Sequence, residues 1–356
     1  MAVVVGAFLV GAAFFAGRLS RTNPKDEKKQ PAVAGQTSQA QASSSTKDAS
    51  TATAHTHAEA EEISRIERLR TDLRRNPSGS VERLNELQAL LNTALKNGSL
   101  SSMGIVGMYK EETDQSILDV LQGVLAANPD YANAAGVTET FTEMARTDQN
   151  ASRRQTAIAY LGTAWDKDGK VKDTLIEIAR NGKDIGLRMC ALGTLKAYLV
   201  KNWTQTEAVT TQLLSVAQND KNEDVRAQAL YSMEIHTGGE KAAMSVLGFL
   251  QDSQPVVRLA TAEKLGDAAP TARPAVVNAL EQAIAQEKES HVKKIMLANL
   301  VKAGRSEAAS ALERVATTNT ELKADAQDYL SILKGGYTDW TDITRLKGDM
   351  EESRGH

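Results

Sequence analysis

The chain has 356 residues and a formal net charge of −3, and its composition is 41% apolar, 4% aromatic and 24% charged. This length allows either two ordinary domains or one elongated domain. The single cysteine, Cys190, excludes an intramolecular disulfide framework and any zinc site built from several cysteines. The slightly acidic balance argues against a protein whose main task is to neutralise nucleic-acid phosphates.

Residues 1–17 carry no charged side chain, and Arg18 and Arg21 follow this apolar run directly. Seventeen helical residues extend over roughly 25 Å, which is near the lower limit for crossing a bilayer. Phe14 and Phe15 occupy the positions where a signal peptide would need small residues before its cleavage site. The sequence therefore predicts an uncleaved, single-pass transmembrane anchor over 1–17, with a poor signal peptide as the alternative.

The basic residues near this anchor all lie on its C-terminal side. They are Arg18, Arg21, Lys25, Lys28 and Lys29. Because basic flanking residues stay on the cytoplasmic side of a membrane, this bias favours a cytoplasmic location for the rest of the chain. The periplasmic or extracytoplasmic side is the alternative.

Residues 18–57 form a segment that is rich in Ser, Thr, Ala and Gln and contains no aromatic residue. Such a composition cannot bury enough apolar surface to offset the entropy lost on ordering, so it predicts a disordered, low-complexity linker. His55 and His57 could hold a metal edge-on, but two ligands in a flexible segment make a weak site, and solvated histidines are the simpler interpretation.

From residue 58 onward, apolar residues recur with helical spacing and no convincing alternating strand pattern is present. Six helices align on a basic residue, with small or apolar residues three and seven positions later, all on one helical face. These basic anchor residues are Arg154, Arg188, Arg226, Arg258, Lys293 and Lys323. They are separated by 34, 38, 32, 35 and 30 residues, a period that holds two helices and a turn.

The helices expected between the anchored ones cover residues 131–146, 170–181, 204–218, 239–250, 270–286 and 305–316. A single helix pair cannot bury its own apolar face, so the pairs must stack on one another as a solenoid. The sequence thus predicts an all-α fold with a solenoid over 58–335. Residues 336–356 lose the periodicity and are expected to form a C-terminal cap in which Tyr337 and Trp340 pack across the last repeat, or a tail that binds a partner.

At these residues the chain resembles the HEAT-repeat family. Three anchored helices carry an acidic residue six positions before the arginine, namely Asp148 before Arg154, Asp220 before Arg226 and Asp252 before Arg258. The resemblance implies that these charges form a structural ladder between adjacent repeats. The period is nearer to that of short bacterial HEAT-like repeats than to the usual 40–47 residues. Together with the anchor predicted over 1–17, the resemblance suggests a membrane-anchored protein of the bacterial type. Tetratricopeptide repeats are the competing assignment, but their Trp-Leu-Gly-Tyr and terminal Pro pattern does not recur.

No residue pattern in the sequence indicates catalysis, a cofactor or a metal site. Di-iron HEAT-like hydroxylases need several His-Glu pairs, and none of the five histidines here precedes a glutamate. A HEAT-like DNA glycosylase would need a basic concave face with a tryptophan near the lesion. Residues 61–356 instead have a net charge of −5, and Trp165 and Trp203 are interpreted as core or rim aromatics. Both observations argue against a glycosylase and against nucleic-acid binding. Cys190 lies in an apolar run and is expected to be a buried side chain without nucleophilic function.

The remaining function is recognition of a protein partner by the curved surface of the solenoid. Positions one and five residues after the anchors lie opposite the buried stripe, and they include Met189, Tyr231 and Leu259. These three are the candidate partner-binding residues, although packing against the next repeat is the simpler explanation of them. We therefore expect a non-enzymatic, membrane-tethered scaffold or adaptor. The alternative is an accessory or lyase-like factor that acts on a protein or a small molecule.

Overall fold

The computed structural model describes residues 48–76, 81–127, 129–132, 134, 136–166 and 169–354. Residues from Thr53 onward form one compact unit, and the preceding unit, Met1–Ala52, is described only from Asp48. The anchor predicted over 1–17 and most of the linker predicted over 18–57 therefore lie outside the described residues. None of the described helices is long and apolar enough to cross a membrane.

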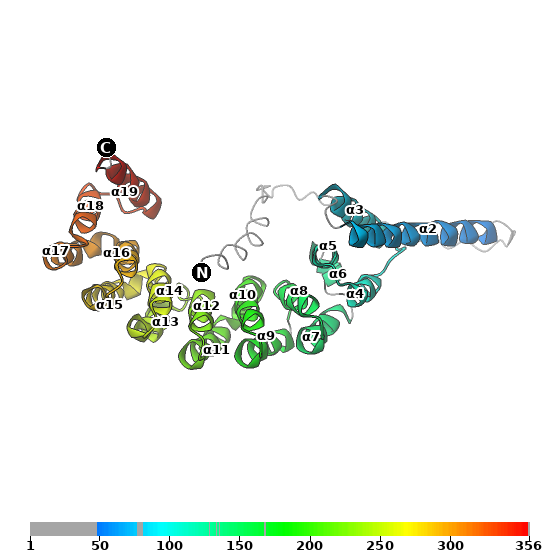
Figure 1. Cartoon of the computed structure of the whole chain (residues 1–356), viewed down its shortest axis with the longest axis horizontal. Coiled ribbons are helices and arrows are strands. Elements are labelled where there is room, and N and C mark those ends of the chain that lie inside the picture. Colours follow the sequence, from blue (N-terminus) through cyan, green and yellow to red (C-terminus); the bar gives the residue numbers. More distant parts are fainter. Residues whose placement is uncertain are drawn as a thin grey trace, which may run out of the picture. The chain divides into compact units, whose positions relative to one another are not determined.

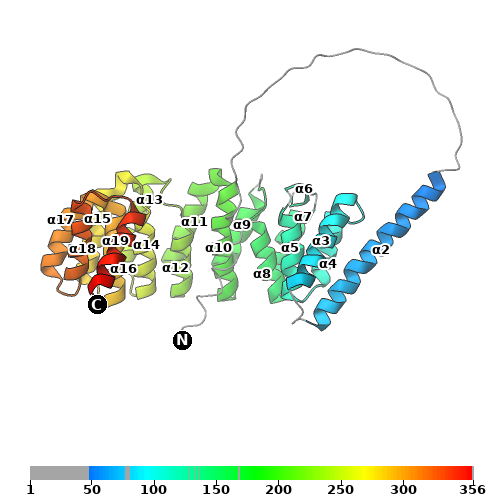
Figure 2. The ribbon, with the colours of Figure 1, turned by 90° about the horizontal axis from the view of Figure 1, so that it is seen from above.

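The described part of the chain is entirely helical, as predicted, and most of its helices form two rows (Figure 1). The anchored helices form the inner row: α8 (Ala151–Leu161), α10 (Ile185–Lys201), α12 (Glu223–Ser232), α14 (Pro255–Gly266), α16 (Ser290–Gly304) and α18 (Lys323–Lys334). Their partners form the outer row: α7 (Val137–Thr147), α9 (Lys170–Asn181), α11 (Thr206–Asn219), α13 (Gly239–Val246), α15 (Arg273–Gln286) and α17 (Ala309–Thr318). Figure 2 shows successive pairs side by side. These helices overlap all six predicted outer segments.

Short 3-10 helices connect or extend several of these pairs. They are η1 (Trp203–Gln205), η2 (Leu247–Gln251), η3 (Pro270–Ala272) and η4 (Arg305–Ala308). Before the first pair lie α2 (Asp48–Arg75), α3 (Val81–Asn97), α4 (Ser102–Glu111), α5 (Gln115–Ala127) and α6 (Pro129–Ala132), and the final helix is α19 (Trp340–Arg354).

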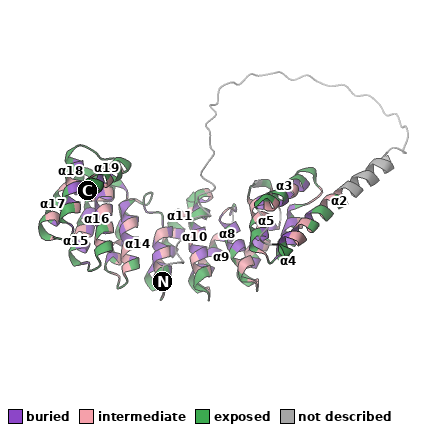
Figure 3. Ribbon diagram, turned by 45° about the horizontal axis from the view of Figure 1, so that its top comes forward, coloured by how far each residue is buried: buried purple, intermediate pink, exposed green. Residues whose placement is uncertain are grey.

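The core follows the stripe predicted from the anchored helices, because the residues three positions after each anchor are buried. They are Ala157, Ala191, Ala229, Thr261, Met296 and Ala326. Figure 3 shows buried residues along the faces where neighbouring helices meet. Neighbouring inner helices also approach closely at Gly266 of α14, where an added Cβ would lie 2.2 Å from the side-chain oxygen of Asn299 in α16. The thin, aromatic-poor core is thus a consequence of stacked helix pairs.

Ion pairs join consecutive repeats along the N-terminal ends of the inner helices. We call the following four pairs the ladder: Arg188 with Asp220 (3.2 Å), Arg226 with Asp252 (3.0 Å), Arg258 with Glu287 (2.6 Å) and Lys293 with Glu321 (2.7 Å). Each of the three arginines also donates a hydrogen bond to the backbone carbonyl six residues before it. The six-residue spacing therefore reflects a contact with the backbone, while the carboxylate at that position pairs with the preceding repeat.

The ladder does not include all of the predicted anchor residues. Asp148 pairs with Arg153 of its own repeat at 2.8 Å, while Arg154 donates to the backbone carbonyl of Asp148. In the ladder, each arginine pairs with the carboxylate that stands six residues before the next anchor. Gly182 stands six residues before the anchor that follows Arg154, so Arg154 finds no carboxylate there, and its buried Nε has no hydrogen-bond partner among the described residues. Lys323 is exposed and makes none of the ion pairs found in the described part of the chain. The first and last anchors thus lie outside the ladder.

The first described helix is longer than the sequence predicted, because α2 begins at Asp48 and not at residue 58. Residues before Ile66 include many alanines, which favour continuation of a helix once its C-terminal half is fixed by packing. That half is fixed by Arg70, which is almost fully buried and bonds to Glu112 at 3.1 Å. The side chain of Glu112 also accepts hydrogen bonds from Arg74. Burial alone would raise the pKa of Glu112, but these hydrogen bonds outweigh it and hold the pKa at about 2.

The C-terminal segment forms a helical cap on the last repeat. Ile343 of α19 is buried, and the buried Lys347 bonds to Asp325 and Asp328 of α18 at 2.7 Å and 3.2 Å. Trp340 packs against the core, but Tyr337 is 44% exposed, so only one of the two predicted aromatic residues contributes to the packing.

Candidate functional site

One side of helix α10 carries a continuous stripe of apolar or small residues that neighbouring helices do not cover fully. With 17 residues, α10 is the longest helix of the inner row. Ile185, Met189, Gly193, Ala197 and Val200 recur every three or four residues, so they lie along one helical face. Ile185 is 43% exposed and Val200 is 81% exposed. We call these five residues the α10 stripe.

The structure places the three predicted partner-binding residues on successive inner helices. Met189 lies on α10, Tyr231 on α12 and Leu259 on α14, and all three are half-buried. Met189 and Tyr231 pack partly against the core. The Tyr231 hydroxyl donates to the carboxylate of Glu263 at 2.5 Å, and burial together with this bond raises the pKa of the phenol. These side chains thus combine packing between repeats with a partly accessible surface.

Two exposed tryptophans flank the C-terminal end of α10, at the rim of the inner row. Trp165 is 55% exposed and Trp203 is 73% exposed, so neither belongs to the core. We call Trp165, Val200 and Trp203 the rim patch. Tryptophan is enriched among the residues that dominate binding energy at protein interfaces, and exposed apolar groups of this size are typical of interaction sites.

Hydrogen bonds hold the backbone beside both tryptophans in place. The amide N–H of Asp166 donates to the side-chain oxygen of Asn202 at 3.3 Å, and the Asn202 side chain donates to the carbonyl of Ala164 at 3.2 Å. The hydroxyl of Tyr198 donates to the carboxylate of Asp166 at 3.0 Å. Residues 164–166 are therefore bonded directly to the end of α10. Because these residues are held in place, the rim patch loses little conformational freedom on binding a partner.

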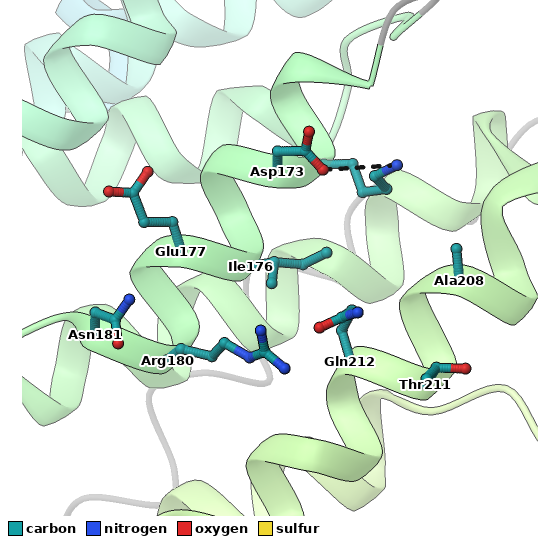
Figure 4. Close-up of a pocket in the computed structure, with 9 residues that line it drawn as sticks. Asp173, Ile176, Glu177, Arg180, Asn181, Ala208, Thr211 and Gln212 are labelled. Carbon is teal, nitrogen blue, oxygen red and sulfur yellow. Dashed lines mark ion pairs between the residues drawn. The ribbon is translucent and has the colours of Figure 1, made fainter.

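A cavity of about 530 Å³ lies between α9 and α11 in the outer row (Figure 4). Its charged lining residues are Lys172, Asp173, Glu177 and Arg180, so positive and negative charges balance. Lys172 lies 3.6 Å from Asp173, and Glu177 pairs with Arg146 at 3.0 Å. The lining thus has no net charge, and the cavity offers no preference for a ligand of either sign.

The described residues include no group of three or more histidine, cysteine or acidic side chains that could hold a metal ion. His236 and His291 are exposed, while His55 and His57 lie on α2 and His356 lies outside the described residues. Cys190 is buried, and burial raises the pKa of its thiol to about 11. The thiol of Cys190 is consequently protonated at neutral pH, which suits a packing role.

The sequence was compared with known proteins and protein families. No match was found among curated proteins. Residues 138–234 match the family of HEAT repeats. This range covers three helix pairs, from α7 to α12, and contains the α10 stripe and the rim patch. The match and the stacked helix pairs together support a HEAT-repeat protein, a helical repeat type that mediates protein–protein interactions.

Proposed function

We propose that this protein is a non-enzymatic, membrane-tethered scaffold or adaptor that holds a protein partner on its inner row of helices. The α10 stripe, which includes Met189, and the rim patch form the centre of the binding surface, and Tyr231 and Leu259 extend it across the next two repeats. The observation that carries this proposal is the exposure of Trp165, Val200 and Trp203, beside the hydrogen bond that joins Asp166 to Asn202, in the region that matches HEAT repeats. Burial of these side chains by a partner would remove a large apolar area from water.

The ladder supports this proposal because it separates structural charges from the surface offered to a partner. Its ion pairs lie at the N-terminal ends of the inner helices, where the chain turns from the outer row. The rim patch lies at the opposite, C-terminal ends of α8 and α10. A partner can therefore contact the rim patch without breaking the ion pairs that join the repeats.

The tether rests on the sequence of residues 1–57. The uncharged run over 1–17 would anchor the chain in a membrane, and the polar segment that follows would give the helical array reach. The basic residues after the anchor favour a cytoplasmic array. Extraction of membranes at alkaline pH tests the anchor: the full chain should stay in the membrane pellet, whereas a variant that lacks residues 1–17 should be released. Release of both would refute the anchor.

Photo-crosslinking from defined positions tests the binding surface. A photoreactive amino acid at Met189 or Val200 should give crosslinks to the same single protein. The matched control is Gln218, an exposed residue of α11 in the outer row. Equal crosslinking from Gln218, or no crosslinked protein from either inner position, would refute the proposed surface.

Substitution at the rim patch provides a quantitative test on the crosslinked partner. Trp203→Ala should weaken binding at least about tenfold, because tryptophan is enriched among interface hot spots, whose truncation costs about 2 kcal/mol or more. Met244→Ala is the control, since Met244 is 49% exposed on α13 of the outer row. Equal affinities of the Trp203→Ala and wild-type proteins would remove Trp203 from the interface.

A further inference from the structure

A second cavity, of about 570 Å³, lies at the C-terminal ends of the inner helices. Helix α10 supplies Lys196, α14 supplies Lys264 and α16 supplies Lys302, while Trp340 of α19 lines one wall. Figure 1 shows α10, α14 and α16 in the inner row and α19 beside α18 at its end. The cavity therefore depends on several repeats and on the C-terminal cap. We call it the basic cavity.

The charges of the basic cavity do not balance, unlike those of the cavity between α9 and α11. Five of its lining residues are basic and two are acidic, which gives a net charge of +3 with neutral histidine. The basic residues are Lys196, Lys264, Arg273, Lys302 and Arg305, and the acidic ones are Glu234 and Asp267. This excess is notable in a chain whose total formal charge is −3.

Ion pairs within the fold compensate only part of this excess positive charge. Lys302 pairs with Asp267 at 2.6 Å, and Arg273 lies 3.7 Å from Glu307. Lys196 and Arg305 are both exposed, and their side chains make no ion pair or hydrogen bond within the described ranges. These two cations consequently have no structural partner that explains them.

Lys264 is the most buried cation of the cavity, with 9% of its surface exposed. Its ammonium donates to the backbone carbonyl of Met233 at 2.8 Å, which satisfies one donor but neutralises no charge. Burial, and then the nearby charge of Lys196, lower the pKa of Lys264. An anion placed between these two lysines would relieve both the desolvation and the repulsion.

The walls of the basic cavity also contain apolar groups, including Ile235, Pro270 and Trp340. A ligand that fits would carry carboxylates next to apolar side chains, which is the chemistry of an acidic peptide. A flat bilayer surface could not enter a concave cavity. Nucleic acid needs a longer basic track, and residues 61–356 have a net charge of −5.

We propose that the basic cavity binds an acidic, extended peptide segment of a protein partner. Carboxylates of the segment pair with Lys196, Lys264 and Arg305, and its apolar side chains contact Trp340. The inference rests on the proposed function, because it specifies the chemistry of the partner that the solenoid holds. It also assigns a role to α19, since the cap supplies the aromatic wall.

The test uses the full chain and a fluorescein-labelled peptide of about ten residues, which is about 33 Å long when extended. In this peptide Asp and Glu alternate with Leu and Gly, and a neutral version carries Asn and Gln at the acidic positions. Fluorescence anisotropy should show binding of the acidic peptide alone. Affinity should fall as the salt concentration rises, because the contact depends on charge.

The decisive variant is the double substitution Lys196→Gln with Arg305→Gln, which should weaken binding of the acidic peptide at least about tenfold. Both residues lack structural partners, and circular dichroism will verify that the fold is retained. The control is Lys183→Gln with Lys221→Gln, which removes the same charge from two exposed lysines at the other ends of the inner helices. The control should bind the peptide like the wild type. An equal loss of affinity in both double variants would overturn the site.

Two further outcomes would also overturn the proposal. One is no binding of the acidic peptide at low salt, and the other is cavity-dependent binding of inorganic phosphate or phosphatidylserine vesicles in place of the peptide. Crosslinking of a protein partner from Met189 does not involve the basic cavity. A positive crosslink with a negative peptide result would reject this inference alone, whereas a failed crosslink would reject the proposed function.

Discussion

The Arg258–Glu287 pair should contribute most to the stability of the ladder. The side chain of Glu287 is 1% exposed and that of Arg258 is 15% exposed. Two hydrogen bonds of 2.6 Å and 2.7 Å join the guanidinium to the carboxylate. The same carboxylate also accepts the backbone N–H groups of Lys288 and Glu289 at 2.8 Å and 3.0 Å. We predict that Glu287→Gln destabilises the contact between α14 and α16, because it leaves Arg258 without its anionic partner.

The pKa of Glu287 gives the magnitude of the stabilisation that Glu287→Gln removes. Burial raises it, but the hydrogen bonds from Arg258 and the backbone outweigh burial and hold the pKa at about 2, below the ordinary value of 4.5. At about 1.4 kcal/mol per tenfold change, this difference corresponds to about 3 kcal/mol at most. The folded state has the lower pKa, so the stabilisation is fully present above pH 4.5 and is lost as the pH falls toward 2.

The assay is amide hydrogen exchange on the full chain, because stacked repeats can open locally without unfolding as a whole. Amides of α14 and α16 should exchange faster in Glu287→Gln, by a factor that corresponds to about 2–3 kcal/mol. The double variant with Arg258→Met should lose less than the sum of the single losses. Glu313→Gln is the control, because both side chains of the Glu313–Lys334 pair are more than half exposed. This substitution should lower the free energy of unfolding by less than about 0.5 kcal/mol. Additive losses in the double variant, or unchanged exchange in α14 and α16, would refute the reasoning.

Three further predictions concern packing. Gly266→Ala should destabilise the array by about 1–3 kcal/mol in urea unfolding, because its new Cβ would meet Asn299. Gly248→Ala is the control and should be neutral, because its new Cβ meets nothing within 4 Å. Equal unfolding midpoints of the two variants would contradict this prediction. Lys347→Met should loosen α19, seen as faster exchange of its amides, because Asp325 loses its cationic partner and Asp328 keeps only Arg354; unchanged protection would argue against the cap. The thiol of Cys190 should react about a hundredfold more slowly with a disulfide reagent at pH 8 in the folded chain than in urea, because burial raises its pKa; equal rates would contradict its burial.

The sequence was sufficient to predict the helix pairs, because the buried stripe recurs at fixed offsets from each anchor. It did not predict the pairing within the ladder. The resemblance implied a ladder of charges between adjacent repeats but did not specify the partners. Arg226 bonds to the backbone carbonyl of Asp220 and to the carboxylate of Asp252. Glu287 was missed as a ladder residue because a glutamate stands where three other repeats carry aspartate. Nothing in a periodic pattern distinguishes these contacts.

The basic cavity could not be predicted from the repeat. Lys196, Lys264 and Lys302 stand eight, six and nine residues after their anchors, so an alignment on the anchors does not place them in one column. They converge because inner helices of different lengths end at a common edge. Trp340 comes from outside the repeats altogether. Binding surfaces of this kind depend on irregular helix ends, whereas the core depends on the regular middle of each helix.

The two ends of the inner helices therefore separate stability from recognition. At the N-terminal ends, each arginine of the ladder has a carboxylate of the next repeat within 3.2 Å, so its charge is already compensated. At the C-terminal ends, Lys196 and Arg305 have no such partner, and Trp165 and Trp203 remain exposed. Substitution of a paired charge in the ladder lowers the free energy of unfolding, whereas substitution of an unpaired charge changes it little. Substitutions of these four residues should consequently change affinity without changing stability, and substitutions in the ladder should do the reverse.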